Sequence, residues 1–323
     1  MKKFILNRIL AMIITLILTA VIIFTITYLI PGDPASALLG TAASAAEKEK
    51  MNHLLGVDRP YLVQLGDYLY KTFIKFDFGE SWVYKVPVFQ ELLKRMPYTL
   101  IIGLGGMILN VTLGIYLGVV AGVNEGKWQD NVTMAIAMIL ASAPDFWVAL
   151  LMIILFSVRL GWLPPFGVGS AKNFILPIIA SSLYGIAVNA RYGRNSILEV
   201  FREDYITTAR AKGVPEKYVI RKHMLPNALM PIITNIGGIL SRIIAGSVVI
   251  ETVFSIPGVG LYLLNAVNGR DYPAIRSSVL FFAFFTSVVM LFVDLAYAAL
   301  DPRIKARYAS VGGVKRWKNR RRE

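Results

Sequence analysis

Six apolar stretches, each long enough to cross a lipid bilayer, limit the fold of this sequence more than any other feature. A helix needs about 20 mostly apolar residues to span the hydrocarbon core. Inside a bilayer every backbone polar group has to be paired within the protein, and a helix pairs them within a single segment. We therefore predict an all-α integral membrane protein with six transmembrane helices. The predicted spans are Ile9–Ile30, Thr99–Val123, Val132–Val158, Ile175–Ala190, Ala228–Phe254 and Ser277–Leu300.

The low share of charged residues supports this class. Only 17% of the 323 residues are charged, whereas about 25% is typical of soluble domains. The first apolar stretch follows Met1-Lys2-Lys3, as in a signal peptide, but it ends in "LIPGDP" without a small-x-small cleavage site. We therefore expect it to be retained as the first span.

Lysine and arginine residues orient the predicted spans. Three lie in residues 1–8, eight in 191–227 and nine in 303–322, while the short segments 159–174 and 255–276 hold two each. Because cytoplasmic loops are enriched in Lys and Arg, we expect a multi-pass plasma membrane protein with both termini in the cytoplasm. The net charge of +14 is then explained by topology and lipid headgroups, and no nucleic-acid partner is expected. The tail "VKRWKNRRRE" is expected to anchor on anionic lipid.

A charged segment, residues 202–226, interrupts the apolar pattern on the cytoplasmic side. Gly213 suits the position just past a helix C-terminus, because glycine tolerates positive φ. Pro215 suits the first turn of a following helix, and Leu225-Pro226 is expected to end that helix. The pattern predicts a compact amphipathic helical hairpin, which either rests on lipid headgroups or fits a groove of a partner protein.

Small residues recur at every fourth position of the second predicted span. They allow helices to approach closely, so we predict a helix-packing seam, with a second subunit as one candidate for the facing surface. An asparagine at the same spacing is expected to bond between helices. The positions are Gly106, Asn110, Gly114, Gly118 and Gly122.

Four ionisable residues also lie inside predicted spans, namely Asp145, Arg242, Glu251 and Asp294. Such residues are costly in hydrocarbon and generally face a partner or a cavity. Two interpretations remain open: Arg242 pairs with Asp145 or Asp294, or the four residues line a translocation path.

The outer segment 31–98 is too long for a simple connector. Its stretch "YLVQLGDYLYKTFIKF" has apolar and aromatic residues at mixed helical spacing. It predicts either a helix lying on the outer leaflet or a docking surface for another protein.

Several kinds of chemistry are absent from the sequence. It has no cysteine and only two histidines, His53 and His223, so thiolate and histidine-rich metal sites are not expected. No Gly-x4-Gly-Lys-Ser/Thr motif for ATP and no hydrolase or metalloprotease motif is present. We expect no metal, no bound cofactor and no catalytic residue in this chain.

Several motifs in order along the chain resemble one transporter family. Gly213, His223, Leu225 and Pro226 form a Gly-x9-His-x-Leu-Pro pattern that resembles the EAA loop of ABC-importer permeases. "LIPGDP", "LLGVDRPYLVQL", "DFGESW", "RMPYTL", "LGWLPPFG", "ARAKG", "LPNALMP", "VVIETVFSIPGVG" and "AALDPRIK" are similar to the dipeptide/oligopeptide/nickel permease family, in the subunit with the long first outer loop. The resemblance covers about residues 5–305. It departs from the family pattern at Thr207-Thr208-Ala209, at His223 and at Asp145.

The resemblance implies a type I ABC-importer permease fold and a function. The chain would form half of the translocation pathway for di- or oligopeptides, and nickel or a metal–chelate complex is the alternative cargo. Its partners would be a homologous second permease, two ATPase subunits that bind ATP and Mg, and an extracytoplasmic substrate-binding protein. The implied divisions are 1–30 (first span), 31–98 (outer loop region), 99–305 (permease domain) and 306–323 (basic tail).

The resemblance also assigns roles to residues. The hairpin would be a coupling helix in a cleft of the ATPase, with Gly213→Pro expected to uncouple hydrolysis from uptake without preventing folding. Its coupling residues would be Tyr205, Ala209, Arg210, Ala211, Lys212, Gly213, Leu225 and Pro226. A segment re-entering the membrane from outside would add Ser255, Pro257 and Gly258 to the path or gate formed by Asp145, Arg242, Glu251 and Asp294.

Two other functional classes remain open on the residues alone. A stand-alone secondary transporter or channel would need an ion relay among the four intramembrane ionisable groups, and it gives no reason for a cytoplasmic hairpin. An integral membrane enzyme is disfavoured by the missing nucleophile and metal motifs.

Overall fold

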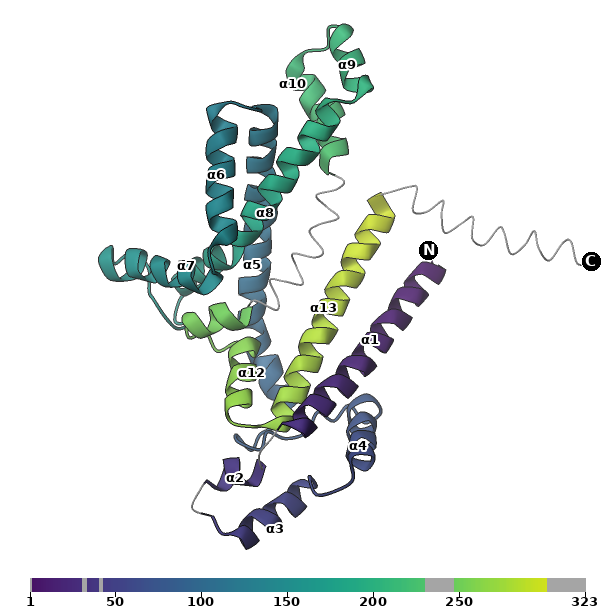
Figure 1. Ribbon diagram of the computed structural model, residues 1–323, viewed down its shortest axis with the longest axis vertical. Coiled ribbons are helices and arrows are strands. Elements are labelled where there is room, and N and C mark those ends of the chain that lie inside the picture. The colour runs from purple at the N-terminus through teal and green to yellow at the C-terminus, as the bar shows by residue number, and fades with distance from the viewer. Residues whose placement is uncertain (1, 31–33, 41–42, 230–246, 301–323) are drawn as a thin grey trace, which may run out of the picture. The chain divides into compact units, whose positions relative to one another are not determined.

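Helices form almost all of the regular structure in the computed structural model, which describes residues 2–30, 34–40, 43–229 and 247–300. Figure 1 shows their order along the chain. The α-helices are α1 (Lys2–Leu29), α2 (Pro34–Leu39), α3 (Ala45–Leu55), α4 (Tyr61–Phe73), α5 (Val88–Val123), α6 (Trp128–Ser142), α7 (Asp145–Met152), α8 (Ile175–Phe201), α9 (Asp204–Ala211), α10 (Glu216–Tyr218), α12 (Val259–Asn268) and α13 (Tyr272–Leu300). Shorter elements are the π-helical turns η1 (Ile153–Arg159) and η3 (Val219–Met224) and the 3-10 turn η2 (Ala171–Phe174).

Four helices in the described part of the chain are long and apolar enough to cross a membrane, and a bent helix pair raises the number to five. The four are Ile5–Leu29 of α1, α5, Ala171–Phe201 including α8, and Tyr272–Phe292 of α13. They correspond to the first, second, fourth and sixth predicted spans. The predicted all-helical membrane class is therefore confirmed. Most of the fifth predicted span, 230–246, lies outside the described residues.

The third predicted span, Val132–Val158, is not one continuous helix, so that prediction was wrong. Helix α6 ends at Ser142, and the following helical segment from Asp145 to Arg159 is bent away from it by 106°. The cause is Pro144, because the residue before a proline is pushed out of helical geometry. Ala143 accordingly has φ −78° and ψ 132°, which is extended backbone.

Two other helix boundaries differ from the predictions. Helix α8 continues past Ala190 to Phe201, so the first part of the basic 191–227 segment is helical. Leu225-Pro226 does not end a helix, since residues 225–229 are helical. Pro226 follows the π-helical turn η3, in which the Leu225 N–H bonds to the Ile220 carbonyl. Such a widened turn already departs from α-helical hydrogen bonding and accommodates the missing N–H.

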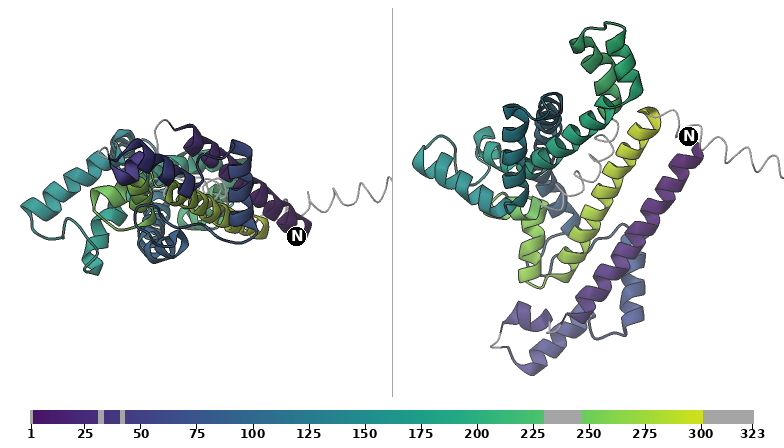
Figure 2. Two further views of the ribbon diagram at one scale, coloured as in Figure 1. Left: turned by 90° about the horizontal axis from the view of Figure 1, so that it is seen from below. Right: turned by 45° about the horizontal axis from the view of Figure 1, so that its top comes forward.

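The chain divides into two compact units. The first comprises the described parts of Met1–Leu92 and Asn265–Glu323, in which α1 and α13 lie side by side (Figure 2). Leu16 and Ala20 of α1 pack with Leu280 of α13, and one face of α4 covers them. The amphipathic stretch predicted in the outer segment is thus helix α4, which packs on α1.

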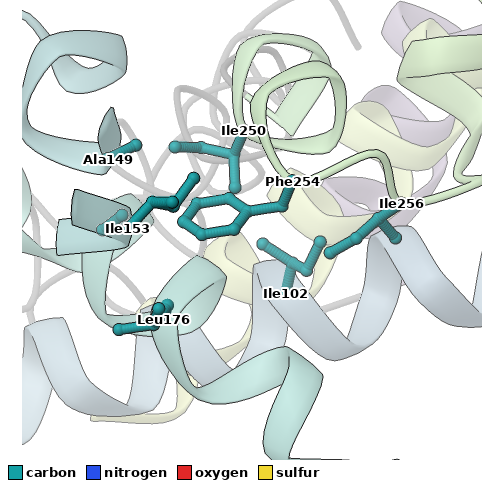
Figure 3. Close-up of a cluster of buried hydrophobic side chains, with 8 residues drawn as sticks. Ile102, Ala149, Ile153, Leu176, Ile250, Phe254 and Ile256 are labelled. Carbon is teal, nitrogen blue, oxygen red and sulfur yellow. The ribbon is translucent and has the colours of Figure 1, made fainter. Parts of the chain in front are cut away.

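The second unit, Leu93–Leu264, contains α5 from Leu93 onward and α6 to α10. One apolar cluster of this unit joins α5, α7 and α8 to the segment that precedes α12. Phe254 lies inside this cluster, near Ile102, Ile153 and Ile250 (Figure 3). The cluster holds the end of helix 247–253 and the turn after it against the rest of this unit.

Candidate functional site

The predicted hairpin is a folded knob beyond the end of α8 (Figure 1). Helix α9 begins with Asp204 in its first turn, where a negative charge is favoured by the helix dipole. Gly213 follows its C-terminus with φ +76°. The Val214 N–H bonds to the Ala209 carbonyl at 3.2 Å, and the Gly213 N–H bonds to the Arg210 carbonyl at 2.9 Å. These bonds satisfy carbonyls that a helix end leaves free and turn the chain sharply toward α10.

The hairpin has an apolar core of its own. Ile206 of α9 and Val219 and Met224 of η3 are fully buried together with Ile197 of α8. Ser196 of α8 also donates a hydrogen bond of 2.7 Å to the Ala228 carbonyl. The knob is therefore packed on α8 and does not hang from it as a loose loop.

A charged pair closes the corner between α9 and α10. Arg210 donates two hydrogen bonds to Glu216, at 3.0 and 2.6 Å, and its guanidinium lies 4.1 Å from the ring centre of Phe201. The hydrogen bonds from Arg210 lower the pKa of Glu216, and those to Glu216 raise the pKa of Arg210. The bidentate geometry fixes the relative orientation of the two helices.

The outward face of the hairpin contains most, but not all, of the predicted coupling residues. Those exposed in the structure are Tyr205, Ala211, Lys212, Gly213 and Pro226. Arg210 is partly buried and is paired with Glu216. Ala209 is only 8% exposed and lies in the hairpin's core, as does part of Leu225. The expectation that Ala209 packs into a partner is therefore corrected, because its methyl group faces α8 and η3.

The expectation for Gly213→Pro also changes. Proline fixes φ near −65°, whereas Gly213 has φ +76° and its N–H is bonded. The substitution would break the corner itself, so it does not separate coupling from folding.

Glu251 forms the centre of a second candidate site. It is fully buried, its Oε1 accepts a 2.6 Å hydrogen bond from Thr99 of α5, and its Oε2 accepts the Leu261 N–H at 2.9 Å. Thr99 in turn accepts the Val259 N–H at 2.9 Å. The turn 254–258 and the start of α12 are thus wrapped around one carboxylate.

The turn residues fit tightly around that carboxylate. A Cβ atom at Gly258 would collide with the Glu251 carboxyl group, and one at Gly260 would lie 2.6 Å from the Cα of Val248. Ser255 is exposed with φ 52°, while Pro257 is partly buried and Gly258 is buried. The structure therefore brings four of the predicted path residues together: Ser255, Pro257 and Gly258 lie in the turn 254–258, and Glu251 lies in the helix that precedes it.

Of the remaining predicted path residues, the structure describes the side chain of Asp145 alone. Asp145 begins α7, directly after the Pro144 break, and is partly buried. Asp294 falls within α13, but its side chain is outside the described part of the structure, as is the whole of Arg242. The expected pairing of Arg242 with Asp145 or Asp294 stays a prediction.

The predicted glycine seam faces α8 of the same chain. A Cβ at Gly114 would lie 2.7 Å from the Cβ of Asn189, and one at Gly122 would lie 2.7 Å from Ile197. Asn110 on this seam is fully buried, and its Oδ1 accepts a 2.6 Å hydrogen bond from Asn189. Its amide group also occupies the space where Gly185 lacks a side chain.

Sequence reasoning missed one ion pair near the hairpin. Arg194 of α8 donates two hydrogen bonds to Asp130 of α6, at 2.5 and 2.8 Å, and the Asp130 side chain is only 3% exposed. The Gly126 N–H also bonds to Asp130 at 3.0 Å. In the sequence, Arg194 is distinguished only as one of the eight Lys and Arg residues in 191–227 that orient the spans. An acidic residue at the start of an apolar helix was the one available indication of its partner.

Within the described ranges, no three His, Asp or Glu side chains are grouped as a metal ion would require. The arrangement instead provides a knob packed on a long apolar helix, a close seam between two apolar helices and a buried carboxylate that orders a turn. All three features pack helices and turns against one another.

Comparison with known proteins identifies the family. Residues 114–306 match the family described as binding-protein-dependent transport system inner membrane component, and residues 1–103 match the family of its N-terminal region. The chain is 38% identical over 313 residues to a protein of Brucella abortus (strain 2308) whose provisional name is peptide transport system permease protein. It is 39% identical over 305 residues to the glutathione transport system permease protein GsiC of Salmonella typhimurium. Each match covers 94% of this chain and 99% of the relative.

A solved structure shares the fold. An inward-facing MetNI methionine ABC transporter matches with a TM-score of 0.55 and 20% identity, covering 67% of this chain and 98% of that chain. The predicted resemblance to ABC-importer permeases is confirmed, as is the expectation that the chain is a permease component and not an enzyme. The chain belongs to the family of binding-protein-dependent transport system inner membrane components.

Proposed function

We propose that this chain is a six-span subunit of a type I ABC importer, that it forms half of a translocation pathway for short peptides, and that the 202–226 hairpin couples it to an ATPase. The observation that carries the proposal is the hairpin. It has its own core, a rigid Gly213 corner and an exposed outer face on α9. A helix that only rests on headgroups needs no such internal core.

Peptides are the proposed cargo because of the relatives. One is named for peptide transport and another for glutathione transport, and the similarity extends over 94% of this chain. Glutathione is itself a small peptide, so both names describe the same chemical class of cargo.

The proposal includes partners and topology. The hairpin implies a cytoplasmic ATPase subunit that binds ATP and Mg. Two such ATPase subunits would serve this chain and a homologous second permease subunit. The family's dependence on a binding protein supports an extracytoplasmic substrate-binding partner. Lys and Arg enrichment supports cytoplasmic termini, with the 306–323 tail on anionic lipid.

We assign the turn around Glu251 to the lining of the path. A sharply turned backbone at membrane depth requires cover by protein or water, and here one buried carboxylate accepts hydrogen bonds from Thr99 of α5 and from the Leu261 N–H of α12. Asp145, Arg242 and Asp294 are proposed members of the same path on the basis of their predicted depth.

The test is a substitution on the outer face of α9. Ala211 is exposed and makes no contribution to the hairpin core. Ala211→Arg should therefore fold normally yet obstruct a close-fitting cleft, whereas Ala211→Ser is the matched control of similar size. Both variants would be purified with their partners and reconstituted in liposomes with the binding protein and labelled tripeptide.

We expect Ala211→Arg to lose most ATP-dependent uptake or to lose the ATPase subunits on purification, while Ala211→Ser keeps both. Full uptake by Ala211→Arg would refute coupling through this face. Uptake that needs no ATP, by a chain purified alone, would instead support a secondary transporter.

A further inference from the structure

A cavity of about 390 Å³ lies in the unit that contains α1, α4 and the start of α13. Its size is within the range of pockets that hold small molecules. Its walls come from Phe24 of α1, from α4, from residues 77–85 and from the first turns of α13. On the proposed topology this cavity is on the extracytoplasmic side, and its lining belongs to neither of the sites described above.

Arg276 is one of the cations that line this cavity. Its guanidinium lies 4.2 Å from the ring centre of Phe24, 5.6 Å from that of Tyr68 and 5.7 Å from that of Tyr272. Its Nε donates a 2.7 Å hydrogen bond to Thr27. Three aromatic rings and one hydroxyl thus hold the plane of the guanidinium in place.

The terminal nitrogens of Arg276 retain their hydrogen-bonding capacity. No carboxylate of the described residues lies within 4 Å of them, in contrast to Arg59, which pairs with Asp67 at 2.8 Å in the same cavity wall. Arg276 also lies near the N-terminus of α13, where the helix dipole disfavours a positive charge. A partly buried arginine in such a place is stabilised when an anionic group occupies the cavity.

Tyr68 lines the same cavity. Its hydroxyl is buried and has no hydrogen-bond partner of good geometry among the residues that the structure describes. Burial raises the pKa of Tyr68 to about 12, against the opposing influence of Arg276 and Thr72. The phenol therefore stays protonated at neutral pH and can donate a hydrogen bond.

The rest of the lining carries both signs of charge. Lys71 and Lys85 add positive charge, whereas Asp77 and Glu80 can receive a positively charged group. One Asp77 oxygen already accepts the Gly79 N–H, which leaves the other available. A ligand with a carboxylate at one end and an ammonium group at the other matches this lining.

We propose that this cavity binds a short zwitterionic peptide, with the peptide's carboxylate held by the guanidinium of Arg276 and the hydroxyl of Tyr68. Arginine presents a planar fork that fits a carboxylate with two parallel hydrogen bonds. The inference rests on the proposed peptide transport and adds a site where α4 and residues 77–85 meet the ends of α1 and α13. The phosphate of a phosphatidylglycerol headgroup shares the anionic chemistry, but its glycerol offers no cation to Asp77 and Glu80.

The test uses the full transporter complex in phosphatidylcholine nanodiscs without added binding protein. The probes are trialanine, trialanine amide and the soluble headgroup glycerophosphoglycerol. Trp82 lines the cavity, so ligand binding should change tryptophan fluorescence in the wild type and leave it unchanged in Trp82→Phe. This pair of measurements localises the ligand.

We expect trialanine to bind about tenfold more tightly than its amide, because the amide lacks the charged acceptor. Arg276→Gln should weaken trialanine about tenfold, and Tyr68→Phe, which removes one oxygen with little risk to folding, should weaken it about threefold. Arg59→Gln is the matched control, since Arg59 lines the same cavity but is already paired.

Equal affinity for trialanine and its amide, or unchanged affinity in both Arg276→Gln and Tyr68→Phe, would overturn the inference. Glycerophosphoglycerol binding more tightly than trialanine would reassign the cavity to lipid. Tripeptide uptake with the binding protein is measured in the same preparation. Normal uptake without cavity binding would defeat this inference alone, while absence of ATP-dependent uptake would defeat the proposed function.

Discussion

The close approach of α5 and α8 at Gly118 leads to a quantitative prediction. A Cβ added at this position would lie 2.8 Å from the carbonyl oxygen of Ala190 and 2.9 Å from the Cα of Gly193. Both atoms belong to the backbone of α8, so no side-chain rotation can relieve the contact. Gly118→Ala must therefore push the two helices apart or strain one of them.

The magnitude comes from comparison with a second glycine. Gly66 in α4 has no atom within 4 Å of an added Cβ. Alanine there gains only helix propensity, about 1 kcal/mol. At Gly118 the same gain is opposed by overpacking, which costs typically 1–3 kcal/mol. The propensity term cancels between the two variants, so Gly118→Ala should be less stable than Gly66→Ala by about 1–3 kcal/mol.

The assay is unfolding by sodium dodecyl sulfate in mixed micelles, followed by far-ultraviolet circular dichroism for both variants and the wild type. Gly118→Leu extends the series, because a larger side chain should destabilise the protein further. Equal stability of Gly118→Ala and Gly66→Ala, or a Leu variant as stable as the Ala variant, would show that α5 and α8 are not in backbone contact at this point.

Two further predictions concern the hairpin and the Glu251 turn. Hydrogen bonds from Arg210 hold the pKa of Glu216 below its ordinary value. The stability that they give is present above the ordinary carboxyl pKa and is lost as the pH falls through the lowered pKa. Hydrogen exchange of residues 204–224, corrected for intrinsic rates, should therefore rise on acidification, and Glu216→Gln should show that rise already at pH 7. Thr99→Val removes the donor to Glu251 and the acceptor for the Val259 N–H, which should cost about 1–3 kcal/mol and expose the turn 254–258 to protease. Thr252→Val, which loses only a bond within its own helix, should behave as the wild type, and equal protease resistance of all three would contradict the proposed order of the turn.

Much of the fold could be predicted because bilayer length and hydrogen bonding leave few choices. The same reasoning failed where a local break competes with apolar composition. Pro144 lies in an apolar stretch, and composition alone does not separate a kinked span from a helix pair bent by 106°. Pro226 shows the opposite case, since a π-helical turn allowed helix where a proline normally ends it.

The candidate sites were predictable to different degrees. Gly213 was recognisable because a positive φ favours glycine at a helix end, and the structure gives it φ +76°. The burial of Ala209 depends on where α9 packs against η3, which helix periodicity alone does not specify. The pairs Asp130–Arg194 and Thr99–Glu251 join residues 64 and 152 positions apart, and no sequence spacing relates them.

In the proposed function, α8 connects the hairpin to the glycine seam, where α8 packs against α5. Its C-terminal end supplies Ile197 to the hairpin core and Ser196 to the Ala228 carbonyl. Its next turn is tied to α6 through the two hydrogen bonds between Arg194 and Asp130. A displacement of the hairpin therefore moves α8 and α6 together.

The glycine contacts extend this movement from α8 to α5. Where two helices meet through side chains, rotamer changes can absorb a small shift. At Gly118 the contact is with backbone atoms of Ala190 and Gly193, so α5 has to move with α8 or separate from it. Close backbone contact thus favours movement of the helices as one body, which is the mechanical property that a subunit driven from its cytoplasmic end requires.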